Sequence, residues 1–238
     1  AYFGKERRIE MFGLLDEIGI DYVELGWPAV SEEVMCAFKE CEKIRKNAKI
    51  VAFGSTAKST NADEDPNLIA IIESGAEYAC IFGKTWHNHI ENQLGISSDE
   101  NLKKIEESIN FLNKKGLAVF YDAEHYFDAF KDDSDYALLT LLTAAKAGAQ
   151  RLILCDTNGG TLPDDSLDIV IRTKDFLKDK GIDVGLGTHF HNDCGVAVAN
   201  ALISCKYVEQ VQGCINGIGE RVGNLDLSSF LPNFMLKL

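Results

Sequence analysis

Two histidines separated by one residue are the part of this sequence best suited to chemistry. His189 and His191 follow the apolar run 184–188, which is typical of a strand. On a strand, side chains at positions i and i+2 point the same way, so both imidazoles can converge on one ion. Neutral imidazole is the commonest metal ligand in proteins, and the pair therefore predicts half of a divalent-metal site.

A glycine-rich loop further along the chain carries the other candidate groups. Residues 217–224 read Gly-Ile-Gly-Glu-Arg-Val-Gly-Asn and supply a carboxylate, a guanidinium and an amide. Together with the histidine pair, this loop indicates a metal-assisted reaction on an oxygen-bearing substrate. Either feature alone would be a weak signal.

The composition of the 238 residues is that of an ordinary globular protein, with 46% hydrophobic and 26% charged residues. The formal net charge is −13 and no Lys/Arg cluster stands out, which argues against nucleic acid and anionic membrane surfaces as partners. No run of about 18 apolar residues is present, so no membrane span is predicted. The seven cysteines are scattered and lack a C-x-x-C pair, which predicts reduced thiols in the cytoplasm.

Short apolar runs alternate with helical patterns along the chain and predict seven strands. The predicted strands are 21–26, 49–54, 78–83, 117–124, 151–157, 184–191 and 210–216. The segment 101–112 between two of them is helical, with Leu102, Ile105, Ile109 and Leu112 on one face. Strands that are each followed by a helix predict a parallel sheet covered by helices.

Two closures of such a sheet are possible, an open doubly wound sheet and a (β/α)8 barrel. No G-x-G-x-x-G follows the first strand, which weakens the dinucleotide-binding open sheet. Polar residues cluster instead at the carboxyl ends of many strands, as they do in barrel enzymes. They are Glu24, Glu124, Asp156-Thr157-Asn158, the two histidines and the 217–224 loop. We therefore predict an α/β fold of the TIM-barrel type.

A complete barrel has eight strands, and the sequence predicts only seven. Residues 4–19 have a helical pattern with no strand before them, and the chain stops at Leu238, where a closing helix is expected. The simplest interpretation is a truncated (β/α)8 barrel. It would form a single catalytic domain over residues 1–238 with the second to eighth strands, without the first strand and the region after the eighth.

The motifs resemble the metal-dependent barrel family of isopropylmalate, homocitrate and citramalate synthases and hydroxymethylglutaryl-CoA lyase. Residues 189–193 match the family's H-x-H-N-D, and residues 219–224 match the G-E-R-x-G-N of the synthases. The lyases carry a Gly-Cys-Pro-Tyr type of loop, whereas residues 213–216 here read Gly-Cys-Ile-Asn. The segments most similar to the citramalate synthase branch are 26–28, 51–55, 81–86, 121–125 and 155–161.

The family's D-T-T-L-R-D-G signature is absent from this sequence. In the family it supplies a metal-binding Asp and an Arg that binds the keto acid. Its absence agrees with the missing first strand.

The resemblance implies a role for each candidate residue. His189 and His191 would bind a divalent metal, with Asn224 as a further ligand through its amide oxygen, and Zn, Mn and Mg all suit this mixed set. Glu124 and Glu220 would be the catalytic carboxylates. The alternative for Glu220 is a salt bridge to Arg221 that only holds the loop.

Glu24, Thr157 and His89 are the substrate-binding candidates. Thr157 would contact the carboxylate of the keto acid, and His89 matches a pocket histidine of the family. Glu24 would pair with the Arg of the missing first strand or, alternatively, face water.

Three further residues are expected to have no metal-binding role. The second H-x-H, His87-Asn-His89, lacks a neighbouring carboxylate, and its two rings are not expected to share a face. His125 should point away from Glu124 if the strand persists, and its expected role is packing. Lys84 lies near a strand end and is either solvated or placed to meet a CoA phosphate.

The implied activity is a metal-dependent Claisen condensation of acetyl-CoA with a short 2-oxo acid. We predict an acyltransferase that converts pyruvate to (R)-citramalate in isoleucine biosynthesis. By analogy with full-length relatives, we expect a homodimer. Isopropylmalate or homocitrate synthesis is the first alternative, because one methylene of the substrate discriminates by only about 1–3 kcal/mol. A hydroxymethylglutaryl-CoA type of lyase and a non-catalytic binding barrel are the others.

Overall fold

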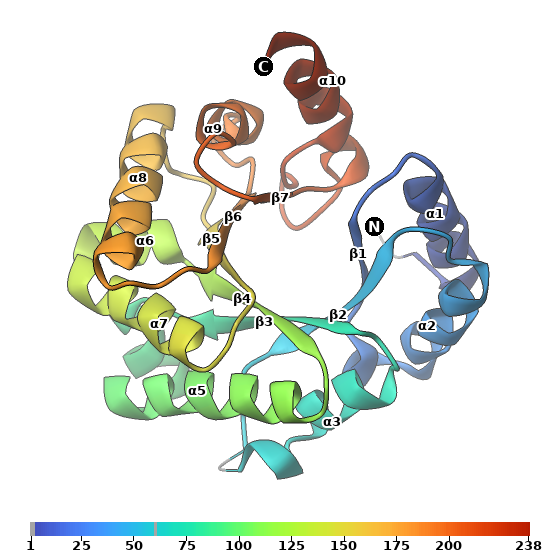
Figure 1. Cartoon of the computed structure of the whole chain (residues 1–238), viewed down its shortest axis with the longest axis horizontal. Coiled ribbons are helices and arrows are strands. Elements are labelled where there is room, and N and C mark those ends of the chain that lie inside the picture. Colours follow the sequence, from blue (N-terminus) through green and yellow to red (C-terminus); the bar gives the residue numbers. More distant parts are fainter. Residues whose placement is uncertain (1–2, 60) are drawn as a thin grey trace. The chain divides into compact units, whose positions relative to one another are not determined.

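The computed structural model describes residues 3–59 and 61–238, in which helices alternate with strands (Figure 1). The strands are β1 (Tyr22–Gly26), β2 (Lys49–Ser55), β3 (Tyr78–Lys84), β4 (Ala118–Glu124), β5 (Arg151–Asp156), β6 (Gly185–Phe190) and β7 (Gln210–Gln212). The helices are α1 (Lys5–Glu17), α2 (Glu32–Ile44), α3 (Pro66–Glu73), α4 (His87–His89), α5 (Ser98–Lys114), α6 (Tyr126–Asp132), α7 (Ser134–Lys146), α8 (Pro163–Asp179), α9 (Ala197–Ser204) and α10 (Leu227–Lys237). No helix in these residues is long and apolar enough to cross a membrane.

The order of the strands decides between the two predicted closures. The strands described here follow one another in the sheet as β1-β2-β3-β4-β5-β6-β7, and the neighbours β1/β2, β2/β3, β5/β6 and β6/β7 pair in parallel. A doubly wound sheet reverses its strand order at a switch point, whereas a barrel continues in one direction. The prediction of an α/β, barrel-type fold with seven strands is therefore confirmed.

The predicted strands are all present, and only their ends differ. β7 ends at Gln212 instead of residue 216, because the chain leaves the ladder there. Cys214 forms an isolated bridge with Asp226, and the 3-10 turn η4 (Ile215–Gly217) follows. β6 ends at Phe190, so His191 lies one residue beyond the strand.

By its internal contacts the chain divides into two compact units. The first contains residues up to Gly83 together with Lys103–Tyr121 and Ala147–Ala149. The second contains Lys84–Leu102, Asp122–Lys146 and Gln150–Leu238. The organisation of residues 1–238 as one catalytic domain stays a prediction.

The first unit has an apolar core made by β2, β3 and β4. Val51, Cys80 and Phe120 are buried together, and the rings of Tyr22 and Tyr78 pack against them. Ile105, Ile109 and Leu112 of α5 are fully buried as their spacing predicts, whereas Leu102 is only half-buried. These strands carry little alternation because both of their faces are covered.

In the second unit, the pleat of β6 separates apolar from polar side chains. Phe190 is fully buried, and its ring lies 5.5 Å from that of Phe127 in α6. His189, one residue earlier, therefore faces the opposite side of the strand. Its Cα partners are Cys155 on β5 and Gln212 on β7.

The strands of the second unit curve toward their polar side. Asp122 on β4 and Gln212 on β7 are three strands apart in the sheet order, yet Gln212 Nε2 donates to Asp122 Oδ1 at 3.3 Å. In a flat sheet, strands spaced about 4.8 Å apart would separate two such positions by roughly 14 Å. The hydrogen bond therefore crosses the concave interior that a barrel-type sheet forms.

A buried carboxylate ties α1 to the segment before β2 in the first unit. Asp16 accepts hydrogen bonds from the backbone N–H groups of Ala48, Asn47 and Lys46 at 2.6–2.8 Å. The bond from Ala48 is the largest influence, and with the others it lowers the pKa of Asp16 despite desolvation. A carboxyl whose pKa is lowered on folding stabilises the fold above its unfolded pKa, and this stabilisation is lost as pH falls through the folded pKa.

Asp16→Asn should therefore lower the urea midpoint of unfolding at pH 7. The amide NH2 of Asn would face the backbone N–H groups that now donate to the carboxylate, and two donors cannot bond to each other. The difference from the wild type should shrink as pH falls below the unfolded pKa of Asp, about 3.9. Circular dichroism in urea at several pH values measures both effects. Glu17→Gln, at the exposed neighbouring position, is the control. Equal midpoints at pH 7, or a difference that grows in acid, would contradict this account.

Candidate metal and substrate site

The two histidines of the H-x-H motif face each other at the end of β6. His189 Nε2 lies 3.2 Å from His191 Nε2. His189 is half-buried, and His191 is buried with 6% exposure. The expected i and i+2 convergence is therefore present, although His191 lies past the strand and not within it.

The glycine-rich loop brings Asn224 to the same place by pairing with the end of β6. His191 and Asn224 form an isolated antiparallel bridge, and Asn192 N donates to Gly223 O at 2.9 Å. Gly223 has a φ of 106°, and a Cβ there would collide with the carbonyl of Gly217. A Cβ on Gly219 would likewise strike the side chain of Asn224. The glycines are needed because the loop folds tightly around this amide.

The three predicted ligands fit a divalent metal. Asn224 Nδ2 lies 3.4 Å from His189 Nε2, and Asn224 Oδ1 is buried without a hydrogen-bond partner. A buried acceptor without a partner is costly unless a ligand completes it. Two nitrogens bound at about 2.0–2.1 Å to one tetrahedral ion stand roughly 3.3 Å apart, close to the separation observed here. In the part of the chain that the structure describes, no group of three or more His, Cys, Asp or Glu is arranged to hold a metal.

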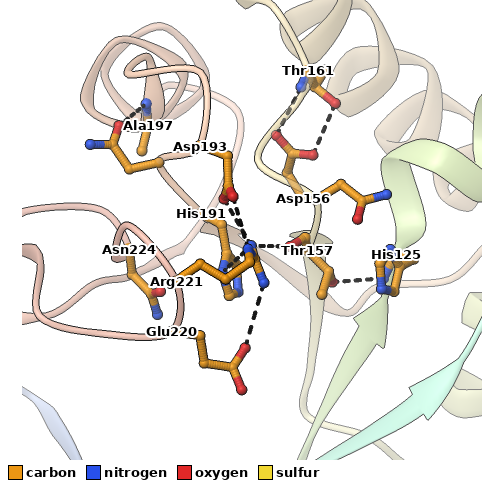
Figure 2. Close-up of polar contacts among 12 residues, drawn as sticks. His125, Asp156, Thr157, Thr161, His191, Asp193, Ala197, Glu220, Arg221 and Asn224 are labelled. Atoms are coloured by element: carbon orange, nitrogen blue, oxygen red, sulfur yellow. Dashed lines mark hydrogen bonds and ion pairs between the residues drawn. The ribbon is translucent and has the colours of Figure 1, made fainter. Parts of the chain in front are cut away.

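Arg221 joins the loop to the segment that carries the histidines (Figure 2). Its Nε and Nη2 donate to the two carboxylate oxygens of Asp193, each at 2.8 Å, and Nη2 also donates to Thr157 O at 2.7 Å. Arg221 has a φ of 52°, a strained conformation for a residue with a side chain. The bidentate pair and the carbonyl bond hold it there.

The same guanidinium restricts the protonation of His191. Burial first, and then the neighbouring His189 and Arg221, lower the pKa of His191 to about 4, so its ring is neutral at pH 7. Arg221 Nη2 lies 3.0 Å from His191 Nδ1. Arg has only donors, so this contact is a hydrogen bond only if Nδ1 carries no proton. Metal ligation through a neutral His191 Nε2 requires the proton on Nδ1, and the two arrangements therefore exclude each other.

The remaining residues of the H-x-H-N-D motif are structural in part. Asn192 Oδ1 accepts from Ala197 N at 3.1 Å and so caps the start of α9. Asp193 holds Arg221 as described above. The sequence alone did not reveal either contact, because both partners lie in segments whose positions depend on the fold.

The catalytic candidates Glu220 and Glu124 have different surroundings. The side chain of Glu220 is 77% exposed and lies 3.9 Å from Arg221 Nη1, a weak contact compared with that of Asp193. Glu124 Oε2 lies 2.6 Å from Lys84 Nζ, an ion pair that falls outside hydrogen-bond geometry. The side chains of this pair are only 21% and 15% exposed. Lys84 is thus neither solvated nor free, unlike the expectation for it.

Thr157 links two parts of the site. Its Oγ1 accepts from the backbone N of His125 at 2.9 Å, and its carbonyl accepts from Arg221. The hydroxyl keeps its own hydrogen to donate to a substrate oxygen. The preceding residue, Asp156, is buried and binds Thr161 N and Oγ1 at 3.1 Å, which closes the loop between them (Figure 2).

The second H-x-H is divided between two environments, as expected. His87 Nε2 lies 3.0 Å from Asp133 Oδ2, and its ring stacks on Tyr136 at 4.3 Å. The ring of His89 instead lies 4.3 Å from that of His125, and its Nδ1 is buried without a partner. Desolvation lowers the pKa of His89. The ring of His89 contacts that of His125, and the backbone N–H of His125 donates to Thr157. The substrate-binding role of His89 stays a prediction.

His125 is buried, as its expected packing role requires, but its expected direction applied only to a continuous strand. The strand does not continue through it, because His125 turns into the left-handed region with a φ of 58°. Its buried ring lies against His89 and its Nδ1 is 3.2 Å from Asp128 Oδ2.

Glu24, the third substrate candidate, is exposed in the middle of β1 in the first unit, and its role stays a prediction as well.

Lys84→Met should destabilise the fold by about 1–3 kcal/mol, because it leaves the half-buried carboxylate of Glu124 without its cation. The double variant Lys84→Met/Glu124→Gln should recover most of this loss. Urea unfolding of the three proteins measures the difference. A single variant as stable as the wild type would mean that the pair contributes no more than a surface ion pair.

Comparisons with known proteins identify relatives of this chain. The chain is 46% identical over 234 residues to a (R)-citramalate synthase of Sulfolobus acidocaldarius, which covers 97% of this chain and 44% of that protein. It is 32% identical to a 2-isopropylmalate synthase of Sulfurisphaera tokodaii, over 93% of this chain and 54% of that protein. The chain thus spans about half the length of these curated relatives.

A crystal structure of hydroxymethylglutaryl-CoA lyase from Pseudomonas aeruginosa has the same fold. It superposes with a TM-score of 0.78 at 16% identity and covers 98% of this chain and 78% of that one. The model of the HMGL-like family matches residues 1–237. With its barrel-type strand order and its paired histidines at a strand end, the chain belongs to the HMGL-like family.

Proposed function

We propose that the protein containing this chain condenses acetyl-CoA with pyruvate and that water then hydrolyses the thioester, to give (R)-citramalate and free CoA in a step of isoleucine biosynthesis. The observation that carries the proposal is the convergence of His189, His191 and the side-chain amide of Asn224, whose nitrogen faces His189 Nε2 and whose buried oxygen has no partner. The similarity supports pyruvate over a longer acid, since identity is 46% to a citramalate synthase and 32% to an isopropylmalate synthase.

The condensation needs a polarised 2-oxo group, a base for the thioester methyl and a donor for the new alkoxide. When bound, a divalent metal held by His189, His191 and Asn224 supplies Lewis-acid polarisation of the 2-oxo group. Thr157 donates its hydroxyl hydrogen to the carboxylate of the keto acid and orients it. Zn, Mn and Mg each suit these ligands.

Two carboxylates divide the catalytic work. Glu220 is exposed and only weakly bound to Arg221, so it is free to turn toward a bound thioester and take a methyl proton. Glu124 is held in place by its ion pair with Lys84. We assign it to positioning the keto acid. Glu24 is assigned to substrate binding on the family resemblance.

Partners and location follow from the same proposal. The substrates are small molecules, and the net charge of −13 argues against nucleic acid or an anionic membrane surface as a partner. The scattered cysteines, which lack a C-x-x-C pair, support a reducing cytoplasm. We propose a homodimer for the protein at its natural length.

CoA-thiol release by the protein at its natural length, with Mn or Zn and a panel of 2-oxo acids, tests the proposal. A blank without substrate corrects for the protein's own cysteines. Pyruvate should be preferred, and His191→Ala should lower kcat/KM at least about 100-fold, because metal polarisation is worth several kcal/mol. His87→Ala, in the second H-x-H, is the matched control and should retain activity.

Other outcomes would redirect the assignment. Release only with longer or branched acids would indicate a sister synthase. Metal binding without release with any acid would contradict the condensation and favour the lyase direction. A protein that binds no divalent metal would contradict the site itself and leave a binding barrel.

A further inference from the structure

We propose that Gln212 and Asp122 are positioning residues that fix the proton of His189 on Nδ1 and so leave its Nε2 lone pair to a metal. This inference rests on the proposed metal site and assigns two residues that lie outside the ligand set. Gln212 is the Cα partner of His189 on the neighbouring strand, and Asp122 lies on β4 across the concave interior of the second unit.

The contacts form a directed chain. His189 Nδ1 lies 2.8 Å from Gln212 Oε1, and Gln212 Nε2 donates to Asp122 Oδ1 at 3.3 Å. An ionised carboxylate only accepts, so the amide must turn its NH2 group toward Asp122. Its oxygen then faces the imidazole and can only accept. The proton of a neutral His189 is therefore required on Nδ1.

Burial makes this direction costly to reverse. Asp122 is 5% exposed, and Gln212 and His189 are half-buried. A flipped Gln212 amide would place its oxygen against the carboxylate and its nitrogen against the imidazole. The oxygen of the flipped amide and the carboxylate would then be two acceptors in contact. In a poorly solvated interior, no water is at hand to donate a hydrogen bond to both, so their repulsion is costly. The carboxylate thus determines the tautomer of an imidazole that it does not touch.

The arrangement has the form of an outer contact that orients a metal ligand. Histidine ligands usually donate their second ring N–H to a carboxylate, carbonyl or water, and loss of that partner costs about 10–100-fold in metal affinity. Here the acceptor is a side-chain amide whose own orientation depends on Asp122. If Gln212 only tied β7 to β4, its hydrogen bonds would be needed, but it would not matter which partner donates and which accepts.

Exchanging the donor and the acceptor separates these two roles. Gln212→Met keeps the bulk of the side chain and removes both hydrogen bonds. The double variant Asp122→Asn/Gln212→Glu restores a chain with the original direction at His189, because the amide now at position 122 donates to the carboxylate now at position 212, which accepts from Nδ1. Gln210→Met, two residues earlier on β7, is the matched control.

Two measurements on the protein at its natural length test the inference, neither of which is activity. Competition with a chelator gives the Zn²⁺ Kd, and ¹⁵N NMR of histidine-labelled, zinc-free protein gives the tautomer of His189. We expect Gln212→Met, which removes the acceptor at His189 Nδ1, to raise the Kd about 10–100-fold. Gln212→Met should also mix the His189 tautomers. The double variant should bind within about 3-fold of the wild type, as should Gln210→Met.

Three results would overturn the inference. They are a wild-type Kd and tautomer in Gln212→Met, a double variant that binds zinc as weakly as Gln212→Met, and a wild-type His189 that carries its proton on Nε2. A wild type that binds no zinc would instead refute the metal site and the proposed function. In that case the ¹⁵N pattern still decides whether Gln212 sets the tautomer.

Discussion

The alternation of side chains along β6 is the constraint on which the site depends. Phe190 packs against Phe127 in the apolar layer under α6, and this burial holds the strand in one rotation about its axis. His189 and His191 are then directed to the concave polar side, where their Nε2 atoms come within 3.2 Å. A shift of one residue would expose the aromatic ring and bury the two imidazoles among hydrocarbon, so core packing and ligand placement enforce each other.

Hydrogen bonds then determine how each imidazole presents its nitrogens. Gln212 accepts at Nδ1 of His189, whereas Arg221 places a donor at Nδ1 of His191. The two rings of one motif thus face opposite kinds of partner. The contact with Gln212 leaves Nε2 of His189 available to bind a metal. His191 can bind a metal through Nε2 only when Arg221 releases its contact with Nδ1. Arg221 retains Asp193 and Thr157 meanwhile, so the loop that carries Asn224 keeps its attachment.

Much of this could be predicted from the sequence, because the relevant signals are local. Apolar runs determine strands, and the i, i+2 spacing of the histidines follows from the pleat alone. The sequence did not reveal the early end of β7, where Cys214 pairs with Asp226 across a turn. It also did not reveal the left-handed turn at His125, since the pattern of β4 contains no glycine there.

The contacts missed by sequence reasoning connect distant segments. Asp122 and Gln212 meet only because the strands of the second unit curve, and Arg221 reaches Asp193 only once the glycine loop has folded. No spacing rule links such positions. The burial of the Lys84–Glu124 pair is of the same kind, because it depends on what covers two strand ends.

Anomalous scattering from crystals of the protein grown with Mn²⁺ or Zn²⁺ tests the central claim most directly. The account predicts one dominant peak within bonding distance of His189 Nε2, His191 Nε2 and Asn224 Oδ1, with Arg221 no longer bonded to His191 Nδ1. A peak at His87 or at the cysteines, or none at the paired histidines at saturating metal, would contradict it.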